Sequence, residues 1–391
     1  MRQLFESKTN RHVSETAPLY PPPIGLRQAV ILCAEVEFDM LAVVYYGPAD
    51  IRVEDRPEPE PTADNLVVKV HCCAICGTDL KLATIGYPRC RPPRIIGHEM
   101  AGSIVHVGAQ VEGFALGERI TLATTLACGE CPYCKLGLGN LCPQAKPISY
   151  DYDGAFAEYV AIPPLALSGG NVITVPDSVP DEVAALSEPL SCALNAQALA
   201  RLKAGDDVLI LGGGPLGALH AELAKALGAG QVMVVERTEP RLTMLRGLRH
   251  VLVIDGAHED VAAVVKSRTG GLGVDVVIVC APVREAMEQA VHYARKGGAV
   301  SFFASLPKDA AEITLDSRAI HYGELRLVGA SDSRPEHVAQ IVRLMTEEKL
   351  DTHSIVTHRV TIKDIHHGLD LMKNRQCLKV LVYPTGRENA V

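Results

Sequence analysis

The segment from residue 206 to residue 237 constrains the fold of this chain more than any other stretch. It reads DDVLILGGGPLGALHAELAKALGAGQVMVVER. An apolar run at 208–211 predicts a buried strand, and the run QVMVVE predicts a second one. Between them, leucines recur at steps of three and four, which predicts a helix with one apolar face. A strand, a helix and a second strand in this order form a βαβ unit, so we expect a parallel sheet.

The turn between the first strand and the helix carries the pattern G-x-G-x-x-G at Gly212, Gly214 and Gly217. In such turns the glycines permit a tight bend, a close approach of the backbone to a pyrophosphate and close packing of helix on strand. The helix opens with Pro215 and Leu216, and its N-terminus would face the phosphates. The pattern therefore predicts a dinucleotide site, with an α/β domain that binds no nucleotide as the alternative.

Glu236 ends the second strand of this unit, nineteen residues after Gly217. A carboxylate there can accept hydrogen bonds from the adenosine ribose hydroxyls and repel a 2′-phosphate, which favours NAD over NADP. Arg237 and Arg241 follow closely, and arginine can bind the additional phosphate of NADP. We therefore expect NAD as the cofactor, with NADP as the alternative.

Four further apolar segments continue the sheet. The predicted strands lie in RHVLVIDG, GVDVVIVCA, GGAVSFFAS and ELRLVGAS, and the segment REAMEQAVHYARK predicts a helix between two of them. Alternation of strands and helices is typical of an α/β fold with a doubly wound parallel sheet.

The length and charge of the chain restrict its organisation and its partners. With 391 residues, the chain is longer than one core usually fills, so we expect two domains. A net charge of −8 argues against nucleic acid or an anionic membrane as a partner and leaves small molecules. The sequence shows no apolar run long enough to span a bilayer and no signal-peptide pattern, so we expect a cytoplasmic protein.

Four cysteines lie close together in CGECPYCKLGLGNLC, at Cys128, Cys131, Cys134 and Cys142. In a reducing compartment, clustered cysteines are more often metal ligands than disulfides. Four thiolates complete the tetrahedral shell of zinc and leave no position for a substrate. We therefore expect a structural zinc site, with two disulfides or buried thiols as the alternatives.

Three short stretches elsewhere hold residue types that bind metals, namely CGTD from Cys76, GHE around His98 and EPL from Glu188. Taken singly, each is more often a core thiol, an ordinary histidine or a turn. In this order, with the four cysteines between His98 and Glu188 and the glycine pattern after them, they resemble the zinc-dependent medium-chain dehydrogenase/reductase family. The resemblance covers residues 40–384. The use of Glu99 and Glu188 rather than a second cysteine is similar to the sorbitol and threonine dehydrogenase branch.

The resemblance implies a catalytic zinc in addition to the structural one. Cys76 and His98 match the constant ligands, and Glu99 matches the ligand beside the histidine. Glu188 matches a carboxylate that approaches the metal directly or through water, and which of the two glutamates is bound at rest stays open. Mixed thiolate, imidazole and carboxylate ligands leave one position of zinc open, as catalysis requires.

The resemblance also implies the reaction. Thr78 matches the hydroxyl that relays the proton of the alcohol, and Asp79 would steady a ligand through a hydrogen bond. Zinc makes a bound alcohol more acidic, and a hydride passes from the same carbon to the nicotinamide. The expected activity is the NAD-dependent oxidation of a secondary hydroxyl on a polyol, sugar or cyclitol-like substrate, or reduction of the ketone in reverse.

Other functions remain as alternatives. A threonine-type amino alcohol dehydrogenase would use the same chemistry. A quinone or enone reductase of the same fold would lack both sets of zinc ligands, and a redox-sensing protein that only holds NAD would have no use for an open zinc site. Residues between the first two ligand stretches are candidates to line or flank the substrate pocket; they are Tyr87, Arg89, Arg91 and Arg94.

The resemblance implies that the chain leaves one domain and later returns to it. Residues 40–193 would form a mainly β, GroES-like catalytic domain with both zinc sites, residues 194–332 the Rossmann NAD-binding domain, and residues 333–391 the return to the first. Residues 1–39 would be an extension that is poorly ordered or packs late onto the domain. Substrate would bind between the domains, and members of the family are usually homodimers or homotetramers.

Overall fold

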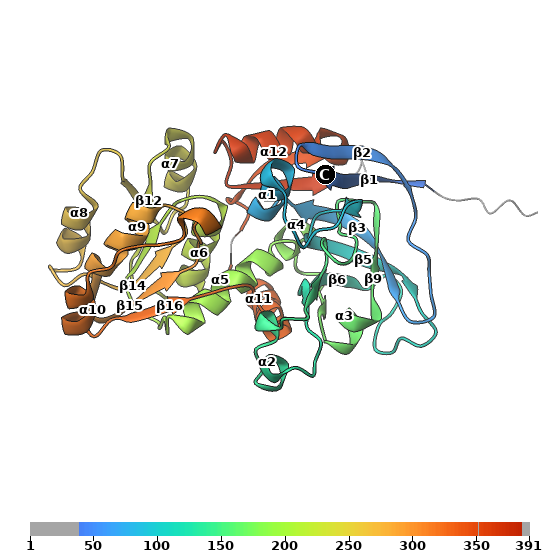
Figure 1. Ribbon diagram of the computed structural model, residues 1–391, viewed down its shortest axis with the longest axis horizontal. Helices are drawn as coiled ribbons and strands as arrows, with labels where there is room; N and C mark the ends of the chain where they lie inside the picture. The colour runs from blue at the N-terminus through green and yellow to red at the C-terminus, as the bar shows by residue number, and fades with distance from the viewer. Residues whose placement is uncertain (1–38, 351, 385–391) are drawn as a thin grey trace, which may run out of the picture. The chain divides into compact units, whose positions relative to one another are not determined.

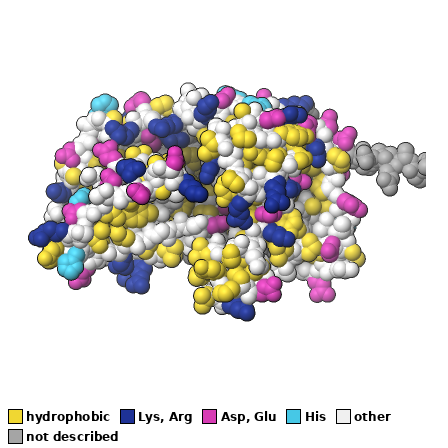
Figure 2. Space-filling view, in the orientation of Figure 1, with side chains coloured by type: hydrophobic (Ala, Val, Ile, Leu, Met, Phe, Trp, Pro, Cys, Tyr) yellow, Lys and Arg dark blue, Asp and Glu magenta, His cyan; other side chains and the backbone are white. Residues whose placement is uncertain are grey.

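The computed structural model describes residues 39–350 and 352–384 (Figure 1). The predicted extension lies outside the described residues, apart from its last residue. On the face shown in Figure 2, acidic and basic side chains are interspersed. No described helix is long and apolar enough to cross a membrane.

Six parallel strands form the sheet that the βαβ unit predicts. In order across the sheet they are β13 (Leu252–Asp255), β12 (Val232–Glu236), β11 (Val208–Leu211), β14 (Val274–Val279), β15 (Ala294–Phe302) and β16 (Arg326–Gly329). The strand order reverses between β11 and β14, and doubly wound sheets bind their ligands beyond the carboxyl ends of the strands at such a reversal. The predicted fold class, a doubly wound parallel sheet, is confirmed.

Helices cover both faces of this sheet. They are α6 (Pro215–Ala226), α7 (Glu239–Arg246), α8 (Val261–Arg268), α9 (Arg284–Gln289) and α10 (Ser317–Gly323), with the 3-10 segments η2 (Ala290–His292) and η3 (Lys308–Ala310). Val208 and Ile210 of β11 pack in one cluster with side chains of α6, whereas Leu209 and Leu211 pack in another with side chains of α8 and α9. Because successive side chains of a strand point to opposite faces, β11 is apolar at every position.

The remaining strands form the mainly β, GroES-like part of the chain. They are β1 (Asp39–Gly47), β2 (Asp50–Pro57), β3 (Leu66–Ala74), β4 (Arg94–Ile95), β5 (Glu99–Val107), β6 (Arg119–Leu122), β7 (Thr125–Leu126), β8 (Lys146–Pro147), β9 (Tyr159–Ile162), β10 (Val172–Thr174), β17 (Val356–Thr361) and β18 (Lys379–Tyr383). The last strand pairs with an early one, since Leu381 of β18 lies opposite Ala74 of β3. After the parallel sheet is complete, the chain therefore rejoins the sheet that contains β3.

One helix connects the two parts without a break. The helices outside the parallel sheet are α1 (Gly77–Ile85), α2 (Pro132–Lys135), α3 (Pro164–Ser168), α4 (Asp181–Ala184), α5 (Ser187–Leu199), α11 (Pro335–Thr346) and α12 (Ile365–Lys373), with η1 (Gly139–Leu141) and η4 (Ile362–Asp364). Helix α5 packs against α6 and against α11, and it runs across the boundary predicted between residues 193 and 194. The exact domain boundaries stay a prediction.

Candidate active site and metal centres

The four cysteines of residues 128–142, which we call the cysteine lobe, converge on one point. Their sulfur atoms lie within 4.8 Å of one another, and Cys131 Sγ is 3.4 Å from Cys134 Sγ. All four are free thiols rather than disulfides. Gly129 and Gly137 have φ angles of +79° and +73°, which glycine adopts without strain and which let the backbone turn around the sulfur atoms.

The cysteine lobe fits a tetrahedral zinc ion. Backbone hydrogen bonds from Glu130 and Cys131 lower the pKa of Cys128 to about 7, so a thiolate forms readily near neutral pH. The thiolate is the form of cysteine that binds zinc. Four protein ligands would leave no position for a substrate, so the arrangement is that of a structural site.

Cys76, His98 and Glu99 converge at a second point. One potential ligand atom from each lies within 4.8 Å of the other two. Cys76 caps the N-terminus of α1, and Glu99, directly after His98, is the first residue of β5. His98 and Glu99 are buried, whereas Cys76 is partly exposed. The structure thus brings together three of the four residues that the sequence nominates as catalytic ligands.

Asp79 lies behind this cluster. Its Oδ2 accepts a hydrogen bond from the Cys76 backbone N–H at 2.8 Å, and its Oδ1 is 3.9 Å from His98 Nδ1. Asp79 Oδ1 and Glu99 Oε1 are buried without a hydrogen-bond partner among the described residues. Buried carboxylate oxygens are costly unless a positive charge compensates them, so the donor set fits a bound cation.

Glu188 lies in a neighbouring cluster. It occupies the first turn of α5, is 7% exposed, and has a carboxylate oxygen within 4.8 Å of Cys192 Sγ and of the Asp332 carboxylate. Burial raises the pKa of Glu188 to about 7, with contributions from the charges of Glu99 and Asp332. The sequence interpretation missed Cys192 and Asp332. Cys192 follows Glu188 by four residues on one helix face and could have been found, whereas nothing local distinguishes Asp332.

The Thr78 side chain has a neighbour that the sequence did not indicate. It lies close enough to the Tyr150 hydroxyl to lower the pKa of that phenol. Burial raises the pKa of Tyr150, so this phenol is protonated at neutral pH. The ring of Tyr87, a predicted pocket residue, packs against the ring of Tyr150 with centroids 5.2 Å apart.

The three arginines proposed to line or flank the pocket have different surroundings. Arg89 Nη2 donates to the Ala145 carbonyl oxygen at 2.7 Å. Arg94 Nη1 pairs with Asp153 at 2.9 Å, and Arg91 is exposed. Of the three, Arg89 lies near enough to the Glu188 cluster for its charge to lower the pKa of Asp332.

Lys379 is a second residue that the sequence interpretation missed. It is the first residue of β18, is 1% exposed, and donates from Nζ to the Ile75 carbonyl oxygen at 3.0 Å. The same Nζ forms an ion pair with the Glu99 carboxylate. Since Glu99 is fully buried, this ammonium supplies the counter-charge that a buried carboxylate needs.

Replacing Lys379 by methionine is expected to destabilise the metal-free chain by about 3 kcal/mol, because a buried carboxylate loses its counter-ion. Urea denaturation measures the change. The double variant Lys379→Met/Glu99→Gln should lose less than the sum of the two single variants. Additive losses would mean that the two groups do not interact.

The glycine turn has the geometry that the pattern predicts. Gly212 has a φ of +108°, and a Cβ at Gly217 would lie 1.9 Å from the Gly212 carbonyl oxygen. Gly214 precedes α6 as its N-terminal cap, and Pro215 and Leu216 begin the helix. No larger residue fits at position 217, so the pattern serves the packing of helix on strand as well as an approaching phosphate.

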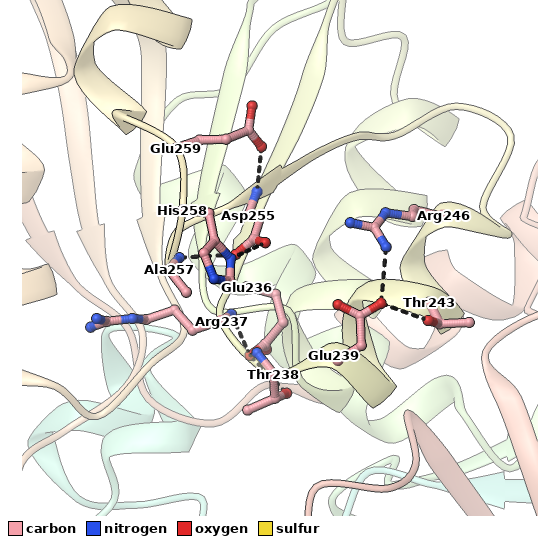
Figure 3. Close-up of polar contacts among 10 residues, drawn as sticks. All are labelled: Glu236, Arg237, Thr238, Glu239, Thr243, Arg246, Asp255, Ala257, His258 and Glu259. Carbon is pink, nitrogen blue, oxygen red and sulfur yellow. Dashed lines mark hydrogen bonds and ion pairs between the residues drawn. The ribbon is translucent and has the colours of Figure 1, made fainter.

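Glu236 lies at the end of β12 with its carboxylate turned back to the backbone (Figure 3). Its Oε1 accepts hydrogen bonds from the N–H groups of Arg237 and Thr238 at 2.8 and 3.0 Å, and its Oε2 accepts one from Gly213 at 3.2 Å. The two arginines considered for a phosphate have different surroundings. Arg237 is exposed, and Arg241 lies beside the glycine turn with Nη1 3.2 Å from a Cβ built at position 214.

Comparisons with known proteins decide the family. Residues 62–174 match the alcohol dehydrogenase GroES-like domain, and residues 215–347 match the zinc-binding dehydrogenase family. A sorbitol dehydrogenase from Halalkalibacterium halodurans is 32% identical over 349 residues, which cover 88% of this chain and 98% of the relative. The chain belongs to the zinc-dependent medium-chain dehydrogenase/reductase family. Within this family, it falls in the sorbitol and threonine dehydrogenase branch.

Two further family members are similar over most of the chain. An L-threonine 3-dehydrogenase from Pyrococcus furiosus is 35% identical over 319 residues, or 80% of this chain and 88% of the relative. The solved structure of a zinc-binding dehydrogenase from Sinorhizobium meliloti 1021 bound to NADP has a TM-score of 0.81 and 32% identity, and covers 89% of this chain and all of that one. The chain is therefore an alcohol oxidoreductase that uses zinc and a nicotinamide cofactor.

Proposed function

We propose that this enzyme oxidises a secondary hydroxyl of a polyol, sugar or cyclitol with NAD, at a catalytic zinc held by Cys76, His98 and Glu99 with Glu188 close by. The convergence of the Cys76, His98 and Glu99 ligand atoms carries the proposal. Similarity to sorbitol dehydrogenases supports the substrate class. A threonine-type amino alcohol is the second candidate, favoured by similarity to L-threonine 3-dehydrogenases.

The side chains around this cluster would bind and orient the reactants. Zinc bound there supplies a Lewis acid that lowers the pKa of an alcohol. Thr78 Oγ1 would accept the alcohol proton, and the neighbouring protonated Tyr150 would orient the Thr78 hydroxyl by donating a hydrogen bond to it. Asp79 fixes the Cys76 backbone and faces His98, so it would hold two ligands in place.

A direct test combines metal analysis with a substrate panel. The purified full-length chain should contain about two zinc ions, one for the lobe and one for the catalytic cluster. It should reduce NAD with polyols or cyclitols faster than with L-threonine. One zinc ion and no turnover would indicate a lobe retained without catalysis, and faster turnover of L-threonine would favour the second candidate.

The preference for NAD is assigned to the Glu236 carboxylate. Glu236→Gln keeps the hydrogen-bond acceptor for the Arg237 and Thr238 N–H groups but removes the charge that repels a 2′-phosphate. We expect the ratio of kcat/KM for NADP to that for NAD to rise about tenfold. Steady-state kinetics with both cofactors measures it. An unchanged ratio would remove Glu236 from cofactor selection.

We also propose the assembly, location and domain division expected for such an enzyme. It would act as a homodimer or homotetramer in the cytoplasm. Its catalytic domain would comprise residues 40–193 and 333–391, and its NAD-binding domain residues 194–332.

A further inference from the structure

Asp332 brings a carboxylate close to Glu188, and the proposed reaction has no use for it. Asp332 lies in the loop between β16 and α11. Its carboxylate lies within 4.8 Å of a Glu188 oxygen and of Cys192 Sγ. Glu188 is buried, whereas Asp332 is partly exposed. Part of the Asp332 side chain is therefore accessible from outside the buried cluster.

The Asp332 loop is held from two directions. Asn195 of α5 donates from Nδ2 to the Asp332 carbonyl oxygen at 2.9 Å, and Asn140 of the cysteine lobe donates to the Ser331 carbonyl oxygen at 2.9 Å. Asp332 has a φ of +59°, which is uncommon for a residue other than glycine and persists only where surrounding contacts enforce it. The carboxylate is therefore fixed in position.

The Asp332 carboxylate accepts hydrogen bonds only from neutral donors among the described residues. These are the Ser333 N–H, at 2.7 Å from Oδ1, and the Thr125 hydroxyl, which donates to Oδ2. A carboxylate accepts about four hydrogen bonds, so each oxygen keeps capacity for a ligand. Arg89 influences Asp332 electrostatically, but its guanidinium is bound to the Ala145 carbonyl oxygen.

The other acidic groups at the site have a positive partner or a place for one. Glu99 pairs with Lys379. Cys76 and Glu188 adjoin the proposed zinc, whose two charges would offset theirs. Within the part of the chain that the structure describes, no lysine or arginine forms an ion pair with Asp332. Burial raises the pKa of Asp332, whereas its hydrogen bonds from Thr125 and Ser333 and the charges of His98 and Arg89 lower it. A carboxylate without a lysine or arginine ion pair is thus left at the edge of the site.

The geometry points to Asp332 as a specificity-determining residue that selects substrates by charge. It favours hydroxyl-rich substrates that are neutral or carry a protonated amine, and it disfavours substrates with a carboxylate near the reacting carbon. The hydroxyl or ammonium donates to the free positions of Oδ1 and Oδ2, whereas a carboxylate meets a fixed like charge. This inference rests on the proposed oxidation of hydroxyl-bearing substrates.

Three probes that differ at one carbon test the inference: sorbitol, 1-amino-1-deoxysorbitol and gluconate. Calorimetry on the zinc- and NADH-loaded full chain gives Kd for each probe, and NAD reduction gives kcat/KM. We expect the amine to bind most tightly and gluconate most weakly. Asp332→Asn keeps the shape of the side chain and one acceptor oxygen but removes the charge. It should narrow the difference in Kd between the amine and gluconate about tenfold. Asp309→Asn, which removes an exposed carboxylate in η3, is the matched control and should change no ratio.

The outcomes separate the inference from the proposed function. Equal weakening of all three probes by Asp332→Asn would make Asp332 only a structural residue and overturn the inference. Tighter binding of gluconate by the unsubstituted enzyme would do the same and would assign recognition to Arg89. The expected order of Kd without turnover of any probe would contradict the proposed oxidation and still support selection by charge.

Discussion

Replacing Cys76 by serine is expected to abolish turnover while the chain remains folded. A hydroxyl is a poor zinc ligand, and the variant should lose one of about two zinc ions. Groups that only support a metal ligand cost about 10- to 100-fold when removed. Loss of the ligand itself should therefore lower kcat/KM about a thousandfold or more. Metal analysis, steady-state kinetics and thermal unfolding measure the three effects.

Cys90→Ser provides the matched control. Cys90 is also a free thiol, is buried, and donates to the Ser149 carbonyl oxygen at 3.6 Å, a bond that serine can reproduce. This variant should keep both zinc ions and its activity. Undiminished turnover of Cys76→Ser would show that the proposed cluster is not the catalytic centre.

Cys131→Ser is expected to act on stability. Cys131 caps α2 and is 9% exposed, with its sulfur among the four that converge in the cysteine lobe. Metal binding contributes directly to folding where the site exists only in the folded chain, so the loss is estimated at about 4 kcal/mol. We expect a Tm lower by about 10 °C and the loss of one zinc ion. Differential scanning calorimetry and metal analysis measure both.

Cys76→Ser should lose activity, whereas Cys131→Ser should lose stability. Cys131→Ser should retain zinc at the catalytic cluster and turn over substrate below its Tm, since no lobe residue belongs to that cluster. Asn140 of the lobe holds the Asp332 loop through a hydrogen bond to the Ser331 carbonyl oxygen. The Cys131→Ser variant should therefore discriminate less between positively and negatively charged substrates. An unchanged Tm with both zinc ions bound would contradict a structural role for the lobe.

Local patterns explain why much of the fold could be predicted. The glycine turn between β11 and α6 and the spacing of the lobe cysteines are contained in short segments, so the residues that act together are neighbours in the sequence. The parallel sheet follows because its central strand β11 is apolar throughout, as burial on both faces requires. Helix α5 differs, since its continuity across a predicted boundary depends on packing against α6 and α11.

Pairings between distant segments explain what the sequence missed. Lys379 meets Glu99 only because β18 pairs with β3, next to β5. A lone lysine in a strand usually lies on a solvated face, so nothing marked it as buried. Asp332 reaches Glu188 through a loop whose conformation depends on Asn195 and Asn140. Only the structure shows that Glu188 lies in a cluster with Asp332 rather than in the cluster of Cys76.

The ion pair between Lys379 and Glu99 has a consequence for the order of biosynthesis. Lys379 is translated 280 positions after Glu99, when both zinc-ligand segments and the whole parallel sheet have left the ribosome. Until then, Glu99 has no lysine to neutralise it, and enclosing it would be costly. We therefore expect the nascent amino-terminal half to form its sheet early and its core around Glu99 to close when β18 is available.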